Sequence, residues 1–216
     1  MPRESLTARR ARAQEIFDIL AEEHPDAHCA LDHDSPYQLV VATILSAQCT
    51  DERVNMVTPE LFRCFPSPQD LAGAPLEEIE ELVHSTGFYR NKAKNLIGMA
   101  EGVVERHGGE IPRTLEELTA LPGIGRKTAN VVLGNAFGVD EGVVVDTHVR
   151  RLSNRMHLSR QEDPVKVERD LMKLFPRKRW TLLSHLFIFH GRRVCGARKP
   201  KCAECAVAHR CPSASI

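Results

Sequence analysis

Four cysteines lie close together near the carboxyl end of the chain, and their type and spacing indicate metal chemistry. The spacing is Cys195-x6-Cys202-x2-Cys205-x5-Cys211. Thiolates are soft, charged ligands, and four of them this close in sequence can converge on one metal centre. Structural zinc is usually bound by two ligand pairs that a longer span separates, whereas a single Cys-x2-Cys pair flanked by two further cysteines suits a [4Fe-4S] cluster. Zinc is the alternative, and disulfides are disfavoured because the sequence opens with no signal-peptide pattern.

A proline and two glycines interrupt the helical periodicity of Leu115–Val132. The interruption reads Leu121-Pro122-Gly123-Ile124-Gly125. Pro122 ends the first helix, because the residue before a proline avoids the helical conformation. Gly123 and Gly125 can both adopt positive φ, and N–H groups at the start of the next helix would bind an anion such as a backbone phosphate. We therefore predict a rigid helical hairpin that contacts nucleic acid, with an ordinary helical turn as the alternative.

Lys127 and Asp146 are the candidate catalytic residues. Lys127 stands in the first turn of the second hairpin helix, where a cation is unfavourable, so its placement indicates use rather than stability. The positive end of the helix dipole favours the neutral amine, which is a nucleophile; contact with a phosphate is the alternative role. Asp146 precedes a second helical pattern, where an aspartate is a favoured N-cap. The same carboxylate could also face a substrate.

Charge is unevenly distributed along the chain, although the formal net charge is zero. Residues 176–211 contain nine Lys or Arg and a single acidic residue, Glu204. Such a segment predicts a face that binds a phosphate backbone, and a merely solvated surface is the alternative. The hydrophobic content of 42% is enough for a sizeable core and excludes a disordered tail.

Helical periodicity dominates the chain, with apolar residues at spacings of three and four in 13–21, 37–47, 76–83, 93–104 and 165–175. Short loops with Pro, Gly or Ser separate these stretches. The β-branched run Val143–Val145 is too short for a sheet and predicts an extended connector. The sequence therefore predicts an all-α fold of about ten helices. No run of about 18 apolar residues occurs, so we expect a soluble, intracellular protein.

The order of these motifs resembles that of the endonuclease III family, which are bifunctional DNA glycosylases of the helix-hairpin-helix superfamily. The resemblance covers nearly the whole sequence and rests on residues 44–51 (ILSAQCTD), 87–93 (GFYRNKA), the hairpin with Lys127, residues 145–148 (VDTH) and the four cysteines. It implies two helical domains with a DNA-binding cleft between them. One is a six-helix barrel at 31–139 with the helix-hairpin-helix at about 115–132; the other is an iron-sulfur cluster domain formed by 1–30 and 140–216, with the cluster loop at 195–211.

The resemblance also implies catalytic roles. In the family, the lysine matching Lys127 attacks C1′ of a damaged pyrimidine nucleotide and forms a Schiff base that cleaves the 3′ phosphate by β-elimination. The aspartate matching Asp146 stabilises positive charge on the sugar. The residue matching Gln48 fills the space that the flipped nucleotide leaves. Phe88 stands where several relatives have a leucine wedge, so we expect an altered opposite-base preference; burial of Phe88 in the core is the alternative.

The implied partner is double-stranded DNA that contains oxidised pyrimidines or abasic sites. A monomeric enzyme would meet this DNA at the bacterial nucleoid, in the cytoplasm. The candidate DNA-binding residues are Gln48, Phe88, Gly123, Gly125, Arg126, Arg198, Lys199 and Lys201. Two other functions stay open: a monofunctional glycosylase of the same superfamily, which commonly lacks the hairpin lysine, and a noncatalytic, structure-selective DNA-binding protein whose cluster senses redox state.

Overall fold

The computed structural model describes residues 4–215, and every regular element in this range is helical. The α-helices are α1 (Leu6–Glu23), α2 (Pro36–Leu45), α3 (Asp51–Cys64), α4 (Pro68–Ala72), α5 (Leu76–Val83), α6 (Tyr89–His107), α7 (Leu115–Thr119), α8 (Arg126–Phe137), α9 (Thr147–Arg155), α10 (Pro164–Leu174) and α11 (Trp180–Arg193). The short 3-10 helices are η1 (His84–Thr86), η2 (Arg177–Arg179), η3 (Cys202–Glu204) and η4 (Ala208–Arg210). The predicted all-α fold is confirmed. None of the helices between residues 4 and 215 is long and apolar enough to cross a lipid bilayer.

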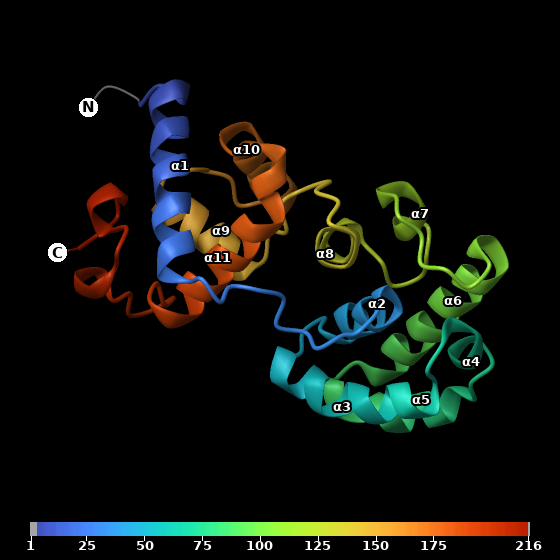
Figure 1. Ribbon diagram of the computed structural model, residues 1–216. Coiled ribbons are helices and arrows are strands. Elements are labelled where there is room, and N and C mark those ends of the chain that lie inside the picture. Colours follow the sequence, from blue (N-terminus) through green and yellow to red (C-terminus); the bar gives the residue numbers. More distant parts are fainter. Residues whose placement is uncertain (1–3, 216) are drawn as a thin grey trace. The chain divides into compact units, whose positions relative to one another are not determined.

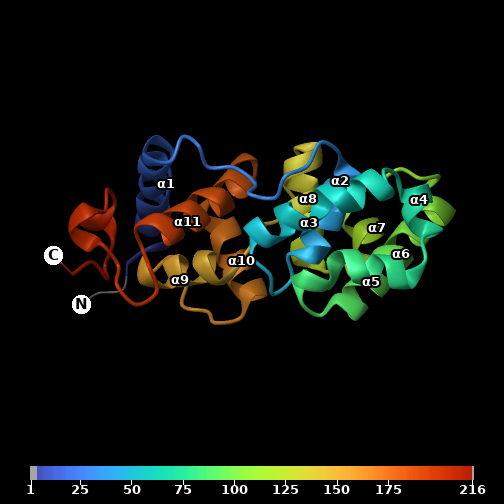
Figure 2. The same ribbon diagram turned by 90° about the horizontal axis from the view of Figure 1, so that it is seen from below.

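The helices form two compact units (Figure 1), and the buried side chains of each unit form an apolar core of its own. The central unit comprises residues 29–139 and contains α2 to α8, with Leu39 and Leu96 fully buried inside it. The terminal unit comprises the described residues 4–28 and 140–215, and α1, α9, α10 and α11 enclose Leu152 and Phe187. This unit is therefore built from both ends of the described chain, and Figure 2 shows α1 beside α11.

Local sequence explains where several helices begin. Ser35, Ser67 and Asp163 each cap a helix with a side-chain oxygen that accepts a backbone N–H bond. Each is followed by a proline, which is favoured in the first helical position because the N–H that it lacks has no intrahelical partner there. The starts of α2, α4 and α10 are thus encoded in two adjacent residues.

Apolar periodicity predicted some helix ends and some helices incorrectly or not at all. The helix expected at 37–47 ends earlier, at Leu45, and Gln48 shortly after it has a φ of +53°, which a right-handed helix cannot accommodate. Periodicity did not reveal α3, which contains an internal Pro59, or α11, whose buried residues surround most of the helix. Val143–Val145 is a buried, extended connector, as predicted.

Candidate active site and metal centre

The break after α7 forms a tight connection to α8 within the central unit. Leu118, Leu121 and Ile124 are buried, so the apolar side of this connection packs into the core as predicted. Gly123 has a φ of +76°, in the left-handed region that favours glycine. The expectation of positive φ at both glycines is wrong for Gly125, which has a φ of −88°. Gly125 is extended because it forms the N-cap of α8.

Glycines let the hairpin approach α6 closely. A Cβ atom on Gly98 would lie 3.2 Å from a side-chain carbon of Pro122, and one on Gly102 would lie 2.8 Å from a methyl carbon of Leu121. A Cβ atom on Gly123 would lie 2.8 Å from the Cβ of Asn95. The hairpin is therefore fixed against α6 by contacts that leave no room for a side chain. We did not identify Gly98 and Gly102 from the sequence, although their i, i+4 spacing places them on one helix face.

Lys127 is exposed in the first turn of α8. Gly125 has no side chain with which to cap this helix, and a Cβ atom there would meet no atom within 4 Å. N–H groups at such a helix start bind anions readily. The central unit thus presents an accessible primary amine next to a helix start that is open to a phosphate.

Asp146 caps α9 in the terminal unit, so its predicted capping role is confirmed. Its Oδ1 accepts a hydrogen bond of 2.8 Å from the backbone N–H of Val149. This cap uses one carboxylate oxygen and holds a half-buried side chain in place. Burial lowers the pKa of the neighbouring His148, and the charge of Asp146 opposes this effect. Lys127 belongs to the other unit.

Gln48 and Phe88 share an unusual backbone conformation. Both are exposed residues of the central unit, and their φ values are +53° and +49°. The left-handed region costs a residue with a side chain roughly 1–2 kcal/mol and is common at functional sites. The side chain of Phe88 cannot be core, because the residue is 63% exposed.

The four C-terminal cysteines line one pocket of the terminal unit. All are half-buried free thiols, and burial raises the pKa of Cys205 and of Cys211. Two nitrogen atoms face sulfur atoms: the donor Arg155 Nη1 lies 3.2 Å from Cys195 Sγ, and His190 Nε2, which is a donor in one tautomer of the ring, lies 3.3 Å from Cys205 Sγ. Such donors stabilise anionic sulfur, which is the form that binds metal.

The donor set fits an iron-sulfur cluster. Within residues 4–215, no three His, Cys, Asp or Glu side chains lie close enough to hold a single metal ion. The four thiols nevertheless face a shared pocket. A cubane cluster takes one thiolate at each of four irons, so it needs four sulfur ligands spread around a larger group than one ion.

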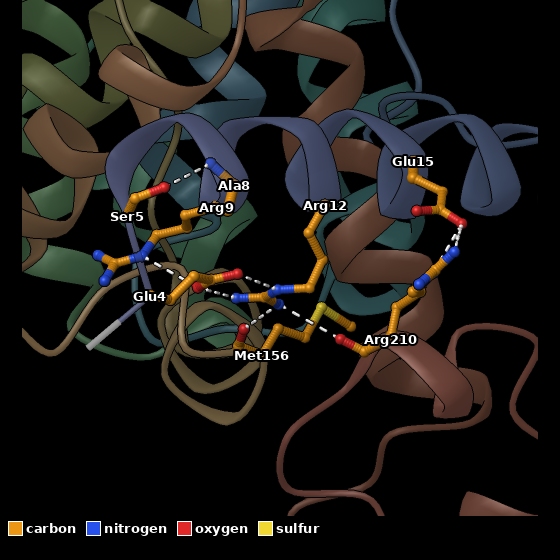
Figure 3. Close-up of polar contacts among 8 residues, drawn as sticks. All are labelled: Glu4, Ser5, Ala8, Arg9, Arg12, Glu15, Met156 and Arg210. Carbon is orange, nitrogen blue, oxygen red and sulfur yellow. Dashed lines mark hydrogen bonds and ion pairs between the residues drawn. The ribbon is translucent and has the colours of Figure 1, made fainter. Parts of the chain in front are cut away.

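The end of the cysteine segment is anchored by α1 (Figure 3). Arg12 Nη1 donates to the backbone carbonyls of Met156 at 2.7 Å and of Arg210 at 3.3 Å. Glu15 forms an ion pair of 2.6 Å with the side chain of Arg210. Because Arg210 precedes Cys211, these contacts from α1 fix the position of the last of the four cysteines.

A chain of two buried histidines ends at one of the thiols. His24 Nε2 lies 3.1 Å from His190 Nδ1, and the Nε2 atom of His190 faces Cys205. Burial lowers the pKa of His190 to about 4 and also lowers that of His24. In the metal-binding thiolate form Cys205 can only accept a hydrogen bond, so a neutral His190 would then donate through Nε2 to the sulfur and accept from His24 at Nδ1. The sequence did not reveal this pair of histidines, because no local pattern connects two residues that lie so far apart in the chain.

The basic segment is less uniformly positive in the structure than in the sequence. At least four of its nine basic residues pair with acidic residues elsewhere in the terminal unit: Arg177 with Glu141, Arg179 with Asp18, Arg193 with Asp26, and Arg210 with Glu15. Counting charges within the segment leaves these acidic partners out, since they come from other parts of the chain. Arg198, Lys199 and Lys201 are exposed together between two of the cysteines, so this loop is where exposed basic residues of the segment cluster; Lys178 and Arg192 are exposed outside it.

Comparison with known proteins identifies similar chains over almost the whole length. A family model described as an HhH-GPD superfamily base excision DNA repair protein matches residues 41–177. The chain is 57% identical to endonuclease III of Synechocystis sp. over 209 residues, which cover 97% of this chain and 95% of that protein. It is 38% identical to endonuclease III of Escherichia coli strain K12 over 202 residues, which cover 94% and 95%. A solved non-covalent endonuclease III–DNA complex matches at 44% identity with a TM-score of 0.89, covering 95% of this chain and 96% of the other. A trapped endonuclease III–DNA covalent intermediate matches with the same values.

Proposed function

This chain belongs to the endonuclease III family of the HhH-GPD superfamily of base excision DNA repair proteins, and we propose that Lys127 and Asp146 carry out its chemistry. It is a bifunctional enzyme: a DNA glycosylase that removes damaged bases, and a lyase that cleaves the strand at the resulting abasic site. The observation that carries the residue assignment is the exposed amine of Lys127 at a helix start without a side-chain cap.

The chemistry requires an amine and a carboxylate. The Nζ atom of Lys127 attacks C1′ of the damaged nucleotide, and the base leaves with the electron pair of the glycosidic bond and a proton. The sugar ring then opens to an iminium, loss of a C2′ proton breaks the 3′ C–O bond, and water releases the lysine. Asp146 stabilises the positive charge on the sugar while the base departs. Its bond to Val149 holds the carboxylate in a fixed place for this role.

We propose that the substrate is double-stranded DNA with oxidised pyrimidines or abasic sites, which a monomer meets at the nucleoid in the bacterial cytoplasm. Phosphates would be bound by exposed groups of the hairpin and of the loop between two cysteines. These groups are Gly123, Gly125, Arg126, Arg198, Lys199 and Lys201. Gln48 and Phe88 would enter the duplex where the damaged nucleotide flips out. Their left-handed backbones and the 63% exposure of Phe88 support this role.

We propose that Cys195, Cys202, Cys205 and Cys211 bind a [4Fe-4S] cluster. Support comes from four free thiols that line one pocket and from the N–H donors directed at two of the sulfur atoms. When bound, the cluster supplies strong cross-links between segments that have little regular structure of their own. The residues of the protein then present the basic loop in a fixed conformation.

Borohydride trapping tests the assignment of the nucleophile. Borohydride reduces the imine to a stable amine, so a duplex with thymine glycol becomes covalently attached to the protein. We expect an adduct with wild type and none with Lys127→Ala, whose helicity and visible cluster absorbance stay unchanged. Lys94→Ala is the matched control, because Lys94 is an exposed lysine of α6 in the same unit. An undiminished adduct with Lys127→Ala would assign the chemistry to another amine.

A further inference from the structure

Lys92 is a lysine of α6 that is almost fully buried, with 4% of its surface exposed. Lysine is rarely buried unless its ammonium is paired. Here Nζ donates to two backbone carbonyl oxygens, that of Leu45 at 2.8 Å and that of Thr86 at 2.7 Å. Burial lowers the pKa of Lys92, and a cation in the first turn of a helix is unfavourable. The residue therefore does not stabilise its own helix, and its role lies in what the ammonium holds.

The two carbonyls belong to the elements that lead to Gln48 and Phe88. Leu45 is the last residue of α2 and comes three residues before Gln48, and Thr86 is the last residue of η1 and comes two residues before Phe88. Carbonyls at helix ends have no partner within the helix. One ammonium thus connects two segments that are far apart in the sequence.

Both segments hold a strained residue. Gln48 and Phe88 have φ values of +53° and +49°, and Gly87 before Phe88 has a φ of +72°. Such conformations persist only where the surrounding structure fixes them. The side chains of Ser46 and Thr86 bond to carbonyls of their own segments, whereas Lys92 bonds to both segments at once.

We propose that Lys92 is the positioning residue for both insertion residues, fixing the separation of Gln48 and Phe88 so that they enter the duplex as a pair. This inference rests on the proposed function of Gln48 and Phe88. Lys92 acts through them, because its own Nζ is buried among carbonyls. Fixing the pair in the free protein removes the cost of ordering it on DNA.

The first test compares two reactions of Lys92→Met, which removes the ammonium but keeps a long apolar side chain. Single-turnover release of thymine glycol from duplex DNA requires full extrusion of a stacked base, whereas cleavage at a preformed abasic site does not. We expect base release to fall by up to about 100-fold, the loss that a small misplacement of positioning groups can cause. Abasic-site cleavage should change by less than about threefold, since Lys127 is unaffected. Equal losses in both reactions, or no loss, would overturn the inference.

The second test repeats Lys92→Met in a Gln48→Ala, Phe88→Ala background. If Lys92 acts through these two side chains, its effect on base release disappears when they are absent. A loss of the same size in both backgrounds would show a general structural role and overturn the inference. Unimpaired base release by Gln48→Ala, Phe88→Ala alone would instead remove the proposed insertion role, and the inference with it. Impaired base release by Gln48→Ala, Phe88→Ala together with normal release by Lys92→Met would overturn the inference about Lys92 and leave the proposed insertion role in place.

Two further variants keep the inference testable if Lys92→Met does not fold. Lys92→Gln keeps an amide that can donate to one carbonyl, so it should fold and show a smaller loss of base release. Hydrogen exchange should then increase together in peptides that cover residues 46–50 and 86–90. Lys94→Met is the matched control, because Lys94 is exposed on the same helix. Exchange that increases in only one of the two segments, or equally in Lys94→Met, would contradict a shared anchor.

Discussion

The two units hold their candidate site residues by different physical means. In the central unit, the hairpin is fixed by close backbone packing at Gly98, Gly102 and Gly123. In the terminal unit, the cysteine segment contains only the short helices η3 and η4 within residues 195–215 and is anchored by long polar side chains such as Arg12. The first geometry is built into the backbone, whereas the second depends on side-chain contacts and on the metal that we propose. The two units should therefore respond differently to the same kind of perturbation.

Loss of one cysteine should give the largest difference in stability between the two units. We expect Cys202→Ala to lose the cluster and to unfold much of the terminal unit, while the central unit keeps its helices. Structural metal sites contribute about 10–16 kcal/mol of apparent binding energy in small zinc domains, so one missing ligand removes a large stabilising term. Iron content, visible absorbance and hydrogen exchange of each unit would measure this.

The control for this change is Cys64→Ala, which alters a half-buried cysteine of the central unit. It should keep its iron. A fully active, iron-free Cys202→Ala protein with an intact terminal unit would show that the cysteine segment is not held by a metal.

A methyl group in the hairpin should destabilise the central unit instead. Gly123→Ala places a Cβ atom 2.8 Å from Asn95 Cβ at a φ of +76°. We expect the free energy of unfolding of this unit to fall by about 2–4 kcal/mol, because backbone strain and overlap add. Gly125→Ala is the matched control for stability, since its φ is −88° and its surroundings are open. Equal urea midpoints for the two variants would contradict the close-packing account.

Acid should weaken the terminal unit before the central one. Burial lowers the pKa of His185 from 6.5 to about 4, and the charge of His28 adds to this effect. A histidine whose folded pKa is depressed stabilises the folded state above about pH 6.5, and this contribution is lost as the pH falls towards 4. Between pH 7 and pH 4.5, the free energy of unfolding should fall in both proteins, and we expect the fall in His185→Gln to be about 1–3 kcal/mol smaller than in wild type. Urea unfolding at both pH values measures the difference, and parallel losses would rule out His185 as the source.

Removal of one arginine from α1 should have a smaller effect. Arg12→Ala leaves the carbonyls of Met156 and Arg210 without this donor, so we expect the terminal unit to lose about 1–2 kcal/mol and to release iron to a chelator faster. Arg9→Ala is the control, because Arg9 makes a weak ion pair of 3.5 Å with Glu4. It should change stability by less than about 0.5 kcal/mol. Identical rates of iron release from both variants would show that the contacts of Arg12 do not hold the segment.

The smallest effect on stability should come from Phe88→Leu, because the side chain is exposed. We expect an unchanged unfolding midpoint and a change of about threefold to tenfold in relative rates for lesions opposite each of the four bases, since an aromatic ring stacks more strongly than leucine. Steady-state rates on four duplexes that differ only in the opposite base would measure it. Identical profiles for the two proteins would remove the role of the ring in opposite-base preference.

Sequence reasoning succeeded where a feature is local. The helices predicted at 13–21, 76–83 and 165–175, the capping by Asp146 and the hairpin around Gly123 depend on residues within one or two turns of each other, so their types and spacing carry the information. The four cysteines also lie within one short segment, so their spacing predicted that they converge, and in the structure they line one pocket.

The remaining features depend on contacts between distant segments. Lys92 looks like an ordinary helical lysine until Leu45 is known to lie beside it. The pair of His24 and His190, and the acidic partners of the basic segment, are likewise set by folding rather than by neighbours in sequence. A backbone turn such as that at Gln48 has no local sequence signal, because glutamine does not favour positive φ.

The arrangement of α1 has a consequence for the order of events during protein synthesis. Arg12 and the carbonyl of Arg210 are separated by 198 positions, so α1 leaves the ribosome long before its partners exist. At about 5–20 residues per second, this delay is about 10–40 s. Residues 29–139 can fold during that time, while the residues against which Ile16 and Leu20 of α1 pack have not yet been synthesised. The cysteine segment is made after both α1 and the central unit, so loading of the proposed cluster would follow the synthesis of both and would complete the unit to which α1 belongs.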